Sequence, residues 1–508
     1  MKRSTLLAAV LVAAAVSACG TTVPLSEQGA AATGLGSTGS LGGQAGGSSS
    51  GTTGSGFAPT GGSSGSSLGS VGGDSGSSSA SAGSDVTGGG SSTPTGPDGK
   101  LSGRGFTATT LTIGVPMDQG TSAVANSMGI SGAATVSAKD LVDAAIAEVN
   151  RHGGILGRKV VVYYHNFDTA SYIANPSPVV AEMCTDFRDD HHVFAVLFTL
   201  PTPDLRECLA QMGTPLMGGD GGTSVIPQAQ YSAHGGSYFY APQAITVETL
   251  ARLFISSLMA RNFHEKWDTK TGSAGGLAPV KLGVIHADSP DVNALYAAYA
   301  KELAKYGLKF TDSVTYTASV QAGLAATQNA VLKFAADGIT HVYGASAFFL
   351  KDAQNQGYHP RYAYLPGLGE LGAENVPAEQ MKGAMTVGWE PTNDVNQAQD
   401  PGPTAGAAAC RAVMRKAGIT SDARADLQSM YTVCDLVNVF TASLRRGGSI
   451  SVAGFRKGFE SLGTTFPMAL TFNATMAPNH HYGVDAVRDM AWDSACPCLK
   501  YTSKTYRR

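Results

Sequence analysis

The sequence predicts an α/β fold with two separate parallel sheets, preceded by a long segment that has no folded core. Of the 77 residues from Gly29 to Gly105, 26 are Gly and 20 are Ser. This segment lacks the large apolar side chains that would offset its ordering entropy, so it is expected to be disordered. About 400 residues follow it, enough for two ordinary domains. From Leu111 onward, short β-rich runs alternate with longer amphipathic runs, which is typical of βαβ units.

Composition excludes two classes of protein. Charged residues make up 14% of the chain, with 35 basic against 38 acidic side chains. The chain therefore has no strong field of one sign, and no nucleic-acid partner is expected. After residue 20 there is no apolar run of 18 or more residues, which argues against a multi-pass membrane protein.

The N-terminus predicts export. Lys2 and Arg3 precede an apolar segment, Leu6 to Val16, which is typical of a signal peptide over residues 1–18. The letters Val16-Ser-Ala-Cys19 resemble the lipobox of bacterial lipoproteins, which implies that Cys19 is lipidated and anchors the chain on the extracytoplasmic face of the cell membrane. Residues 19–105 would then form a Gly/Ser-rich tether, with an end-to-end distance of about 50 Å as a flexible coil. An ordinary signal peptide with a coincidental cysteine is the alternative.

The first βαβ series begins at Leu111. A strand is predicted at 111–116, then a helix whose Val142, Ala145, Ile146 and Val149 follow the i, i+3, i+4, i+7 pattern. A second strand follows at 159–167. The same alternation then predicts helices at 178–189 and 203–212, and strands at 193–198, 215–217 and 238–240.

A second series follows a long helix predicted at 246–262, and we expect it to form its own sheet. Its strands are predicted at 281–286, 308–316, 341–345 and 361–365, with helices between them. Residues 272–279 read as a surface loop. Beyond this series we expect a strand at 384–389, helices at 404–417 and 427–446, and a β-rich tail after Thr464.

Six cysteines follow Cys19, and an even count in an exported chain favours disulfides. Cys184 and Cys208 are 24 residues apart on two predicted helices, and so are Cys410 and Cys434, so each pair is a candidate bridge. Cys496 and Cys498 remain, and a local disulfide is the first choice for them. A metal or redox site with His480 and His481 is the alternative.

Several segments resemble the type 1 periplasmic-binding proteins, the extracytoplasmic solute-binding subunits of branched-chain amino acid and related ABC importers. The segments are Leu111-Thr-Ile-Gly-Val-Pro, Ala147-Glu-Val-Asn-Arg-His-Gly-Gly-Ile-Leu-Gly-Arg-Lys-Val, Asn166-Phe-Asp, Val193-Phe-Ala-Val-Leu, Lys281-Leu-Gly-Val-Ile-His and Gly338-Ile-Thr-His-Val-Tyr. The resemblance covers about 400 residues. It implies two Rossmann-like lobes joined by a hinge, a small-molecule solute between them, an ABC permease as partner, and neither enzymatic activity nor a cofactor or metal.

The resemblance also implies a domain arrangement in which each lobe is built from two separate stretches of the chain. Lobe 1 would comprise residues 106–245 and 376–446, and lobe 2 would comprise 246–375 and 447–508, the last including the C-terminal tail.

Ligands of open parallel sheets bind beyond the carboxyl ends of the strands. The candidate ligand-binding residues at these ends are Gln119, Thr199, Thr202, Asp220, Gly221, Gly222 and Thr223 in lobe 1, and Asp288, Asp291, Phe348 and Glu370 in lobe 2. By resemblance, the stretches 199–202 and 221–223 would hold a ligand carboxylate. In lobe 2 an acid would pair with a ligand amine and Phe348 would supply an apolar wall. Lobe 2 departs from the pattern of the amino-acid binders, so a cationic or hydroxyl-rich solute suits these residues equally.

Other site motifs are weaker. Gly367-Leu-Gly-Glu-Leu-Gly satisfies G-x-G-x-x-G, but Pro377 and the strand predicted at 384–389 leave little room for the crossover helix of a dinucleotide site. Gly344-Ala-Ser-Ala-Phe lacks the final glycine of a nucleophile elbow. Two functions remain: a membrane-tethered solute-binding protein of an ABC importer, or a ligand-sensing receptor of the same fold without a transport partner.

Overall fold

The computed structural model describes residues 102–120, 134–198, 202–218, 225–317, 320–369, 373 and 376–507. The predicted signal peptide, Cys19 and nearly all of the tether lie outside the described residues. The folded part begins slightly before the expected boundary at residue 105. Arg104 already donates from Nε to Thr214 Oγ1 (3.2 Å) and from Nη2 to the carbonyl oxygen of Arg188 (3.2 Å), which joins the chain to lobe 1 at this point.

The first predicted series forms one parallel sheet of six strands, in the order β13-β5-β4-β3-β1-β2. Its strands are β1 (Thr110–Gln119), β2 (Lys159–Asp168), β3 (Ala195–Phe198), β4 (Leu216–Gly218), β5 (Phe239–Ile245) and β13 (Tyr482–Val484). The five strands predicted from the alternating pattern are all present. We call this sheet and the helices packed on it lobe 1.

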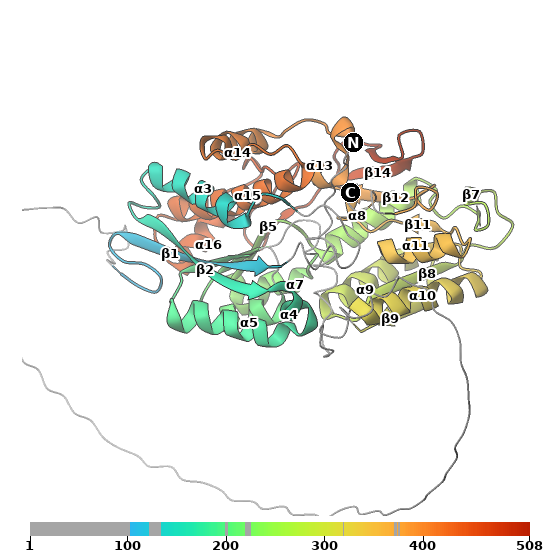
Figure 1. Cartoon of the computed structure of the whole chain (residues 1–508), viewed down its shortest axis with the longest axis horizontal. Coiled ribbons are helices and arrows are strands. Elements are labelled where there is room, and N and C mark those ends of the chain that lie inside the picture. Colours follow the sequence, from blue (N-terminus) through green and yellow to red (C-terminus); the bar gives the residue numbers. More distant parts are fainter. Residues whose placement is uncertain are drawn as a thin grey trace, which may run out of the picture. The chain divides into compact units, whose positions relative to one another are not determined.

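Helices cover both faces of the first sheet (Figure 1). Leu111, Ile113 and Val115 alternate along β1 and all three pack into the core beneath α3 and α15. Gly114, between them, faces the opposite side, where a Cβ atom would lie 2.6 Å from the ring of buried Phe187. One face carries α3 (Ala138–Arg151), α14 (Ala405–Lys416), α15 (Arg424–Gly447) and α16 (Val452–Glu460); the other carries α4 (Thr169–Ala174), α5 (Pro176–Thr185), a π-helical turn (Asp186–Asp190), α6 (Pro203–Gln211) and α7 (Gln228–Ser232).

The second series forms a separate sheet of seven strands, as predicted, in the order β15-β14-β12-β11-β10-β8-β9. Its parallel strands are β8 (Leu282–Ala287), β9 (Phe310–Tyr316), β10 (His341–Tyr343), β11 (Arg361–Ala363) and β12 (Met385–Gly388). The C-terminal tail adds two antiparallel strands, β14 (Arg488–Asp493) and β15 (Cys498–Tyr501). We call this sheet and its helices lobe 2.

Lobe 2 is also a three-layer structure. Val284 packs beneath α8 (Val247–Ala260) and α9 (Pro290–Ala304), whereas Ile285 packs beneath α10 (Val320–Ala336) and α11 (Ala347–Asn355). Successive strand residues point to opposite faces, so one strand supports both helical layers. The loop predicted at 272–279 contains β7 (Ser273–Ala274), which pairs with β6 (Trp267–Asp268) in a small ribbon. In the part of the chain that is described, no helix is long and apolar enough to cross a membrane.

The chain passes between the two lobes three times. It leaves β5 for α8 at Thr246, and leaves β12 for α14 through the short helix α13 (Pro391–Asp394) and a 3-10 turn (Gln397–Gln399). The third passage, at residues 485–487, joins β13 to β14.

Two segments do not follow the expected domain boundaries. β12 was expected in the return to lobe 1 but pairs with β11 and β14 in lobe 2. α16 and β13 were expected in lobe 2, yet α16 packs against α15 and β13 pairs with β5, both in lobe 1. The reason is physical: a strand joins whichever partner is brought beside it by distant parts of the chain, and local sequence carries little of that information.

The three cysteine pairs are disulfide-bonded as predicted. Cys184–Cys208 joins α5 to α6, Cys410–Cys434 joins α14 to α15, and Cys496–Cys498 closes the turn between β14 and β15; the Cα–Cα distances are 6.4, 5.9 and 5.2 Å.

The histidines of the alternative metal site make other contacts. His480 Nδ1 hydrogen-bonds the carbonyl oxygen of Tyr482, and His481 Nε2 hydrogen-bonds Glu460. No group of three or more His, Cys, Asp or Glu among the described residues is arranged to hold a metal ion.

Candidate functional site

The carboxyl ends of the parallel strands define the candidate site. In lobe 1, β1, β3 and β4 end at one edge of the sheet, and α6 begins after β3. In lobe 2, β8 and β10 end at the corresponding edge, where α9 and α11 begin. Helices that start there direct backbone N–H groups toward anything bound beyond the strands.

One ion pair joins these two edges. Arg206 Nη2, on α6, lies 3.0 Å from Oδ2 and 3.3 Å from Oδ1 of Asp291, in the first turn of α9. The Arg206 side chain is only 6% exposed and that of Asp291 is 20% exposed. The guanidinium carbon also lies 5.4 Å from the ring centroid of Phe239. The carboxyl edges of lobe 1 and lobe 2 are therefore in direct contact at this pair.

The predicted residues that lie on described strand ends have polar partners within their own lobes. Gln119 is exposed at the end of β1, and its Nε2 donates to Asn166 Oδ1 on β2 (3.2 Å). Thr202 is the N-cap of α6, where its hydroxyl oxygen accepts from the Leu205 N–H (3.4 Å). Asp288 is exposed after β8, and its Oδ1 accepts from Asn293 Nδ2 (2.7 Å). Thr199, Asp220, Gly221, Gly222, Thr223 and Glu370 lie outside the described residues.

Of the two remaining lobe 2 candidates, the structure changes the interpretation of one. The Asp291 carboxylate, predicted as a partner for a ligand amine, is paired with Arg206 of lobe 1 instead. Phe348 is half-buried in the first turn of α11, next to Phe349, which is fully buried. Phe348 thus stays compatible with an apolar wall, whereas Asp291 has a different partner.

Ser289 was not selected from the sequence as a ligand-binding residue. It is the N-cap of α9, but its Oγ is buried and hydrogen-bonds no described group. An N-cap serine normally accepts from the first turn of its helix, so the N-terminus of α9 lacks its usual side-chain acceptor. The sequence Asp288-Ser-Pro before an apolar run is a recognisable helix start. It is the sequence feature that could have pointed to Ser289. This end of α9 can donate backbone N–H groups to an anionic group, which would then lie beside the carboxylates of Asp288 and Asp291.

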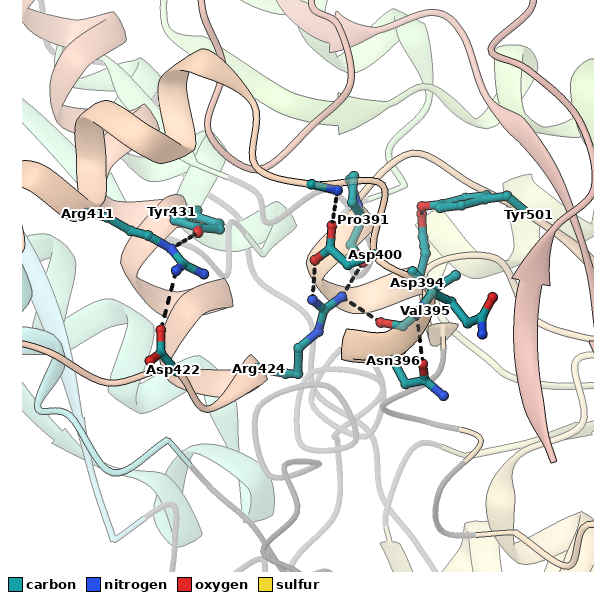
Figure 2. Close-up of polar contacts among 12 residues, drawn as sticks. Pro391, Asp394, Val395, Asn396, Asp400, Arg411, Asp422, Arg424, Tyr431 and Tyr501 are labelled. Carbon is teal, nitrogen blue, oxygen red and sulfur yellow. Dashed lines mark hydrogen bonds and ion pairs between the residues drawn. The ribbon is translucent and has the colours of Figure 1, made fainter. Parts of the chain in front are cut away.

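The second passage between the lobes is held from both sides (Figure 2). Arg424, at the start of α15 in lobe 1, donates from Nη2 to the carbonyl oxygens of Pro391 and Val395, both at 2.5 Å, and its Nη1 pairs with Asp400. On the lobe 2 side, Asp394 Oδ2 accepts from the Tyr501 hydroxyl, at 2.7 Å. The passage is therefore anchored to a helix of one lobe and to a strand of the other.

Asp394 is one of two buried carboxyl groups in this passage, the other being Glu390. Asp394 Oδ2 also accepts from the Glu390 N–H at 2.7 Å. Burial raises the pKa of Asp394 to about 7, although the bonds from Tyr501 and Glu390 favour the ionised form. The carboxyl group therefore titrates near neutral pH at a point where the two lobes are connected.

Close packing explains the glycines that imitate a dinucleotide-binding motif. At Gly369, where φ is 52°, a Cβ atom would lie 2.3 Å from the carbonyl oxygen of Asn393. The side chain of Asn393 donates in turn to the carbonyl oxygen of Gly367, at 2.5 Å. These two glycines let the backbone approach the passage at 390–395, which supports the interpretation that the motif does not bind a nucleotide.

A concave region lies at the opposite end of lobe 1 from the candidate site. It is an open hollow of about 630 Å³ at the start of β5, lined by residues that include Tyr238, Arg456 and Lys457. Arg456 is already engaged there by Glu460 (2.8 Å) and by the carbonyl oxygen of Gly235 (2.6 Å). Because this hollow is at the amino ends of the strands, it is separate from the candidate site.

Comparisons with known proteins agree with this architecture. The family model described as "Periplasmic binding protein" matches residues 119–496. No curated protein sequence gives a significant match.

Solved structures share the fold at low sequence identity. An ABC transporter substrate-binding protein from Aeropyrum pernix has a TM-score of 0.57 and 14% identity, covering 79% of this chain and 96% of that one. A fatty acid ABC transporter substrate-binding protein from Thermomonospora curvata has a TM-score of 0.54 and 13% identity, covering 82% and 96%. A branched chain amino acid ABC transporter protein from Thermus thermophilus, with bound valine, has a TM-score of 0.53 and 12% identity, covering 79% and 96%.

Proposed function

This chain belongs to the periplasmic binding protein family, and from that premise we propose that it captures a small polar solute between its two lobes and delivers it to an ABC importer. Membership places it among binding proteins rather than enzymes. The observation that carries the proposal is the arrangement of the lobes: three passages connect them, and their carboxyl edges meet at Arg206 and Asp291. Such an arrangement permits hinge closure on a solute bound between the edges.

We further propose that the protein is exported and lipid-anchored through Cys19. The basic residues, apolar segment and lipobox-like sequence at the N-terminus support this location. The Gly/Ser-rich residues up to 105 would then let the lobes move while keeping them close to a permease in the same membrane.

The chemistry of the two edges favours a solute that carries an anionic group. The N-terminus of α9 lacks a side-chain cap and has the buried Ser289 hydroxyl beside it. In lobe 1, the proposed ligand groups are the hydroxyls and backbone amides of Thr199, Thr202 and residues 221–223. A solute with both a carboxylate and a second polar group, such as an amino acid or a related compound, fits donors on both sides.

Isothermal titration calorimetry of the full chain tests the proposal. The panel comprises L-amino acids, amides, urea and short aliphatic acids. We expect saturable one-to-one binding of at least one member, because a closing interlobe site holds one solute per chain. If the chain binds no member and instead converts one of them, the solute-binding function is wrong. Permease and ATPase genes beside the gene for this chain would support import over sensing.

Thr223→Ala tests the lobe 1 side of the site. We expect it to weaken solute binding by about 1 kcal/mol, or about fivefold in Kd, because a hydroxyl donor to a buried polar group is lost. The exposed Thr464→Ala is the matched control and should leave Kd unchanged. Equal affinities for both variants and the wild type would remove Thr223 from the site.

A further inference from the structure

The ion pair between Arg206 and Asp291 has features that packing within either lobe does not require. Of the ion pairs among described residues, it is the one that joins a helix of lobe 1 to a helix of lobe 2. The other pairs between described helical residues stay within one lobe, as Lys139 with Asp143 on α3 does. The Arg206–Asp291 pair therefore depends on how the lobes are placed.

Each partner is fixed firmly to its own lobe. Arg206 lies two residues before Cys208, whose disulfide to Cys184 ties α6 to α5. Its guanidinium packs over the ring of Phe239, on β5. Asp291 follows Pro290 in the first turn of α9, and α9 packs along α8. When the lobes separate, neither side chain can follow the other, so the pair must break.

We propose that the Arg206–Asp291 pair is a latch that holds the lobes together in the absence of solute. The inference rests on the proposed function, in which the lobes close around a solute. It gives Asp291 a role different from contact with a ligand amine: the carboxylate adjusts solute affinity by setting the fraction of chains that are already closed. When only a fraction of the protein is binding-competent, the apparent Kd rises as that fraction falls.

The energetics favour a reversible latch. In the arrangement in which the pair is formed, Arg206 is 6% exposed, so removing the Asp291 charge takes away a carboxylate that lies 3.0 Å from a buried cation. In an open arrangement water can reach both side chains, and the same substitution costs little there. Loss of one partner therefore penalises the closed form selectively and shifts the population toward the open form.

Interlobe distances in the solute-free full chain provide the test. Nitroxide labels on unnatural amino acids at positions 181 and 304 report on α5 and α9, since Ala181 and Ala304 are both exposed. Double electron–electron resonance then measures the distance distribution. We expect Asp291→Asn to reduce the short-distance population at least about threefold, and Arg206→Gln to do the same. Asp337→Asn, which removes a carboxylate from a pair inside lobe 2, should leave the distribution unchanged.

A double variant identifies the cause of the shift. If the two residues act through each other, Arg206→Gln with Asp291→Asn shifts the distribution no further than either single change. Additive shifts, or single variants that superimpose on the wild type, would overturn the latch. If Arg206→Gln does not fold, Asp291→Asn and the charge-retaining Arg206→Lys carry the test, with Arg206→Lys expected to be intermediate because it loses the bidentate geometry.

The outcome is separable from that of the proposed function. A chain that shows the distance shift but binds no member of the solute panel would keep the latch and lose the solute-binding role. A chain that binds a solute with unshifted distances in both single variants would keep the function and lose the latch.

Discussion

Lobe 1 and lobe 2 share a three-layer α/β architecture but are fastened by different chemistry. In lobe 1 two disulfides link neighbouring helices, Cys184–Cys208 on one face of the sheet and Cys410–Cys434 on the other. In lobe 2 the only disulfide among the described residues closes a turn, Cys496–Cys498. The amino edge of its sheet is held instead by a buried network of histidine, arginine and aromatic side chains. The stability of lobe 1 should therefore depend more on its disulfides, and the stability of lobe 2 more on pH.

The lobe 2 network is centred on two histidines, of which His341 is fully buried and His264 is partly buried. His341 Nε2 hydrogen-bonds the carbonyl oxygen of Phe263 (2.9 Å), and His264 Nε2 hydrogen-bonds the hydroxyl of Tyr343 (2.8 Å). Arg361 stacks over the ring of Phe263, with its guanidinium carbon 5.1 Å from the ring centroid, and donates to the same carbonyl oxygen. Burial lowers the pKa of His264 to about 4 and that of His341 to about 3, so both are neutral in the folded protein at pH 7.

Acid should therefore produce the largest difference between the lobes. The unfolded chain protonates both histidines below about pH 6.5, while the folded chain protonates His264 only near pH 4 and His341 only near pH 3. The unfolded state binds more protons in that window, so lobe 2 should lose about 5 kcal/mol of stability as the pH falls from 6.5 to 4. Hydrogen exchange measured by mass spectrometry should show β10 and β11 losing protection before β1 and β3.

A single substitution provides the control for this acid effect. His264→Phe removes one titrating group while retaining an aromatic ring, and should roughly halve the pH dependence of lobe 2 protection. An unchanged pH profile in this variant would show that the acid sensitivity has another source.

Removing a helix disulfide should produce the next largest effect, in lobe 1. Cys410→Ser with Cys434→Ser opens a loop with a sequence separation of 24 and should cost about 3 kcal/mol through the entropy of the unfolded chain. Loss of protection should be confined to α14, α15 and the strands beneath them. Cys496→Ser with Cys498→Ser is the matched control, since a separation of 2 restricts the unfolded chain much less. Equal losses in the two variants would contradict the entropic account.

In the passage that joins the lobes, the pH effect should be confined to the segment around Asp394 and have the opposite sign. Asp394 has a folded pKa of about 7, above its unfolded value, so its contribution is fully present below about pH 4 and is lost as the pH rises through 7. Asp394→Asn keeps an acceptor for the Tyr501 hydroxyl and removes the titration. We expect it to flatten the rise in exchange at 390–395 between about pH 4 and 7, where the folded carboxyl group keeps its proton and the unfolded one does not. A rise equal to that of the wild type would exclude Asp394 as its source.

Local sequence patterns predicted the helices and strands well, but they predicted less well the lobe to which each belongs. Alternation along β1 and the i, i+3, i+4, i+7 pattern of α3 identified the buried faces, because the period of the side chains is a property of each element alone. The spacing of the cysteines identified all three bridges. β12, α16 and β13 lie in the other lobe from the one expected. Their partners are β14, α15 and β5, and these contacts depend on chain segments far away in sequence.

The residues of the candidate site also divide into those that the sequence predicted and those that it did not. The strand ends at Gln119 and Asp288 were predictable because parallel strands present their carboxyl ends at one edge. Arg206 was not predictable: an arginine within a short amphipathic helix gives no sign that a carboxylate 85 residues later will lie 3.0 Å away. Ser289 is an intermediate case. The start of its helix could be predicted from the sequence, but the burial of its hydroxyl without a hydrogen bond to a described group could not.

By itself, the sequence determined the α/β class, the two series of strands and helices, the cysteine pairs and the export-like N-terminus. These features depend on side-chain period, spacing and composition, which are local quantities. Only the tertiary structure decided which strands share a sheet, how Arg424 and Tyr501 hold the second passage, and that Asp291 pairs with lobe 1. Such contacts form when folding brings distant residues together, and their energy depends on burial and orientation that no local segment contains.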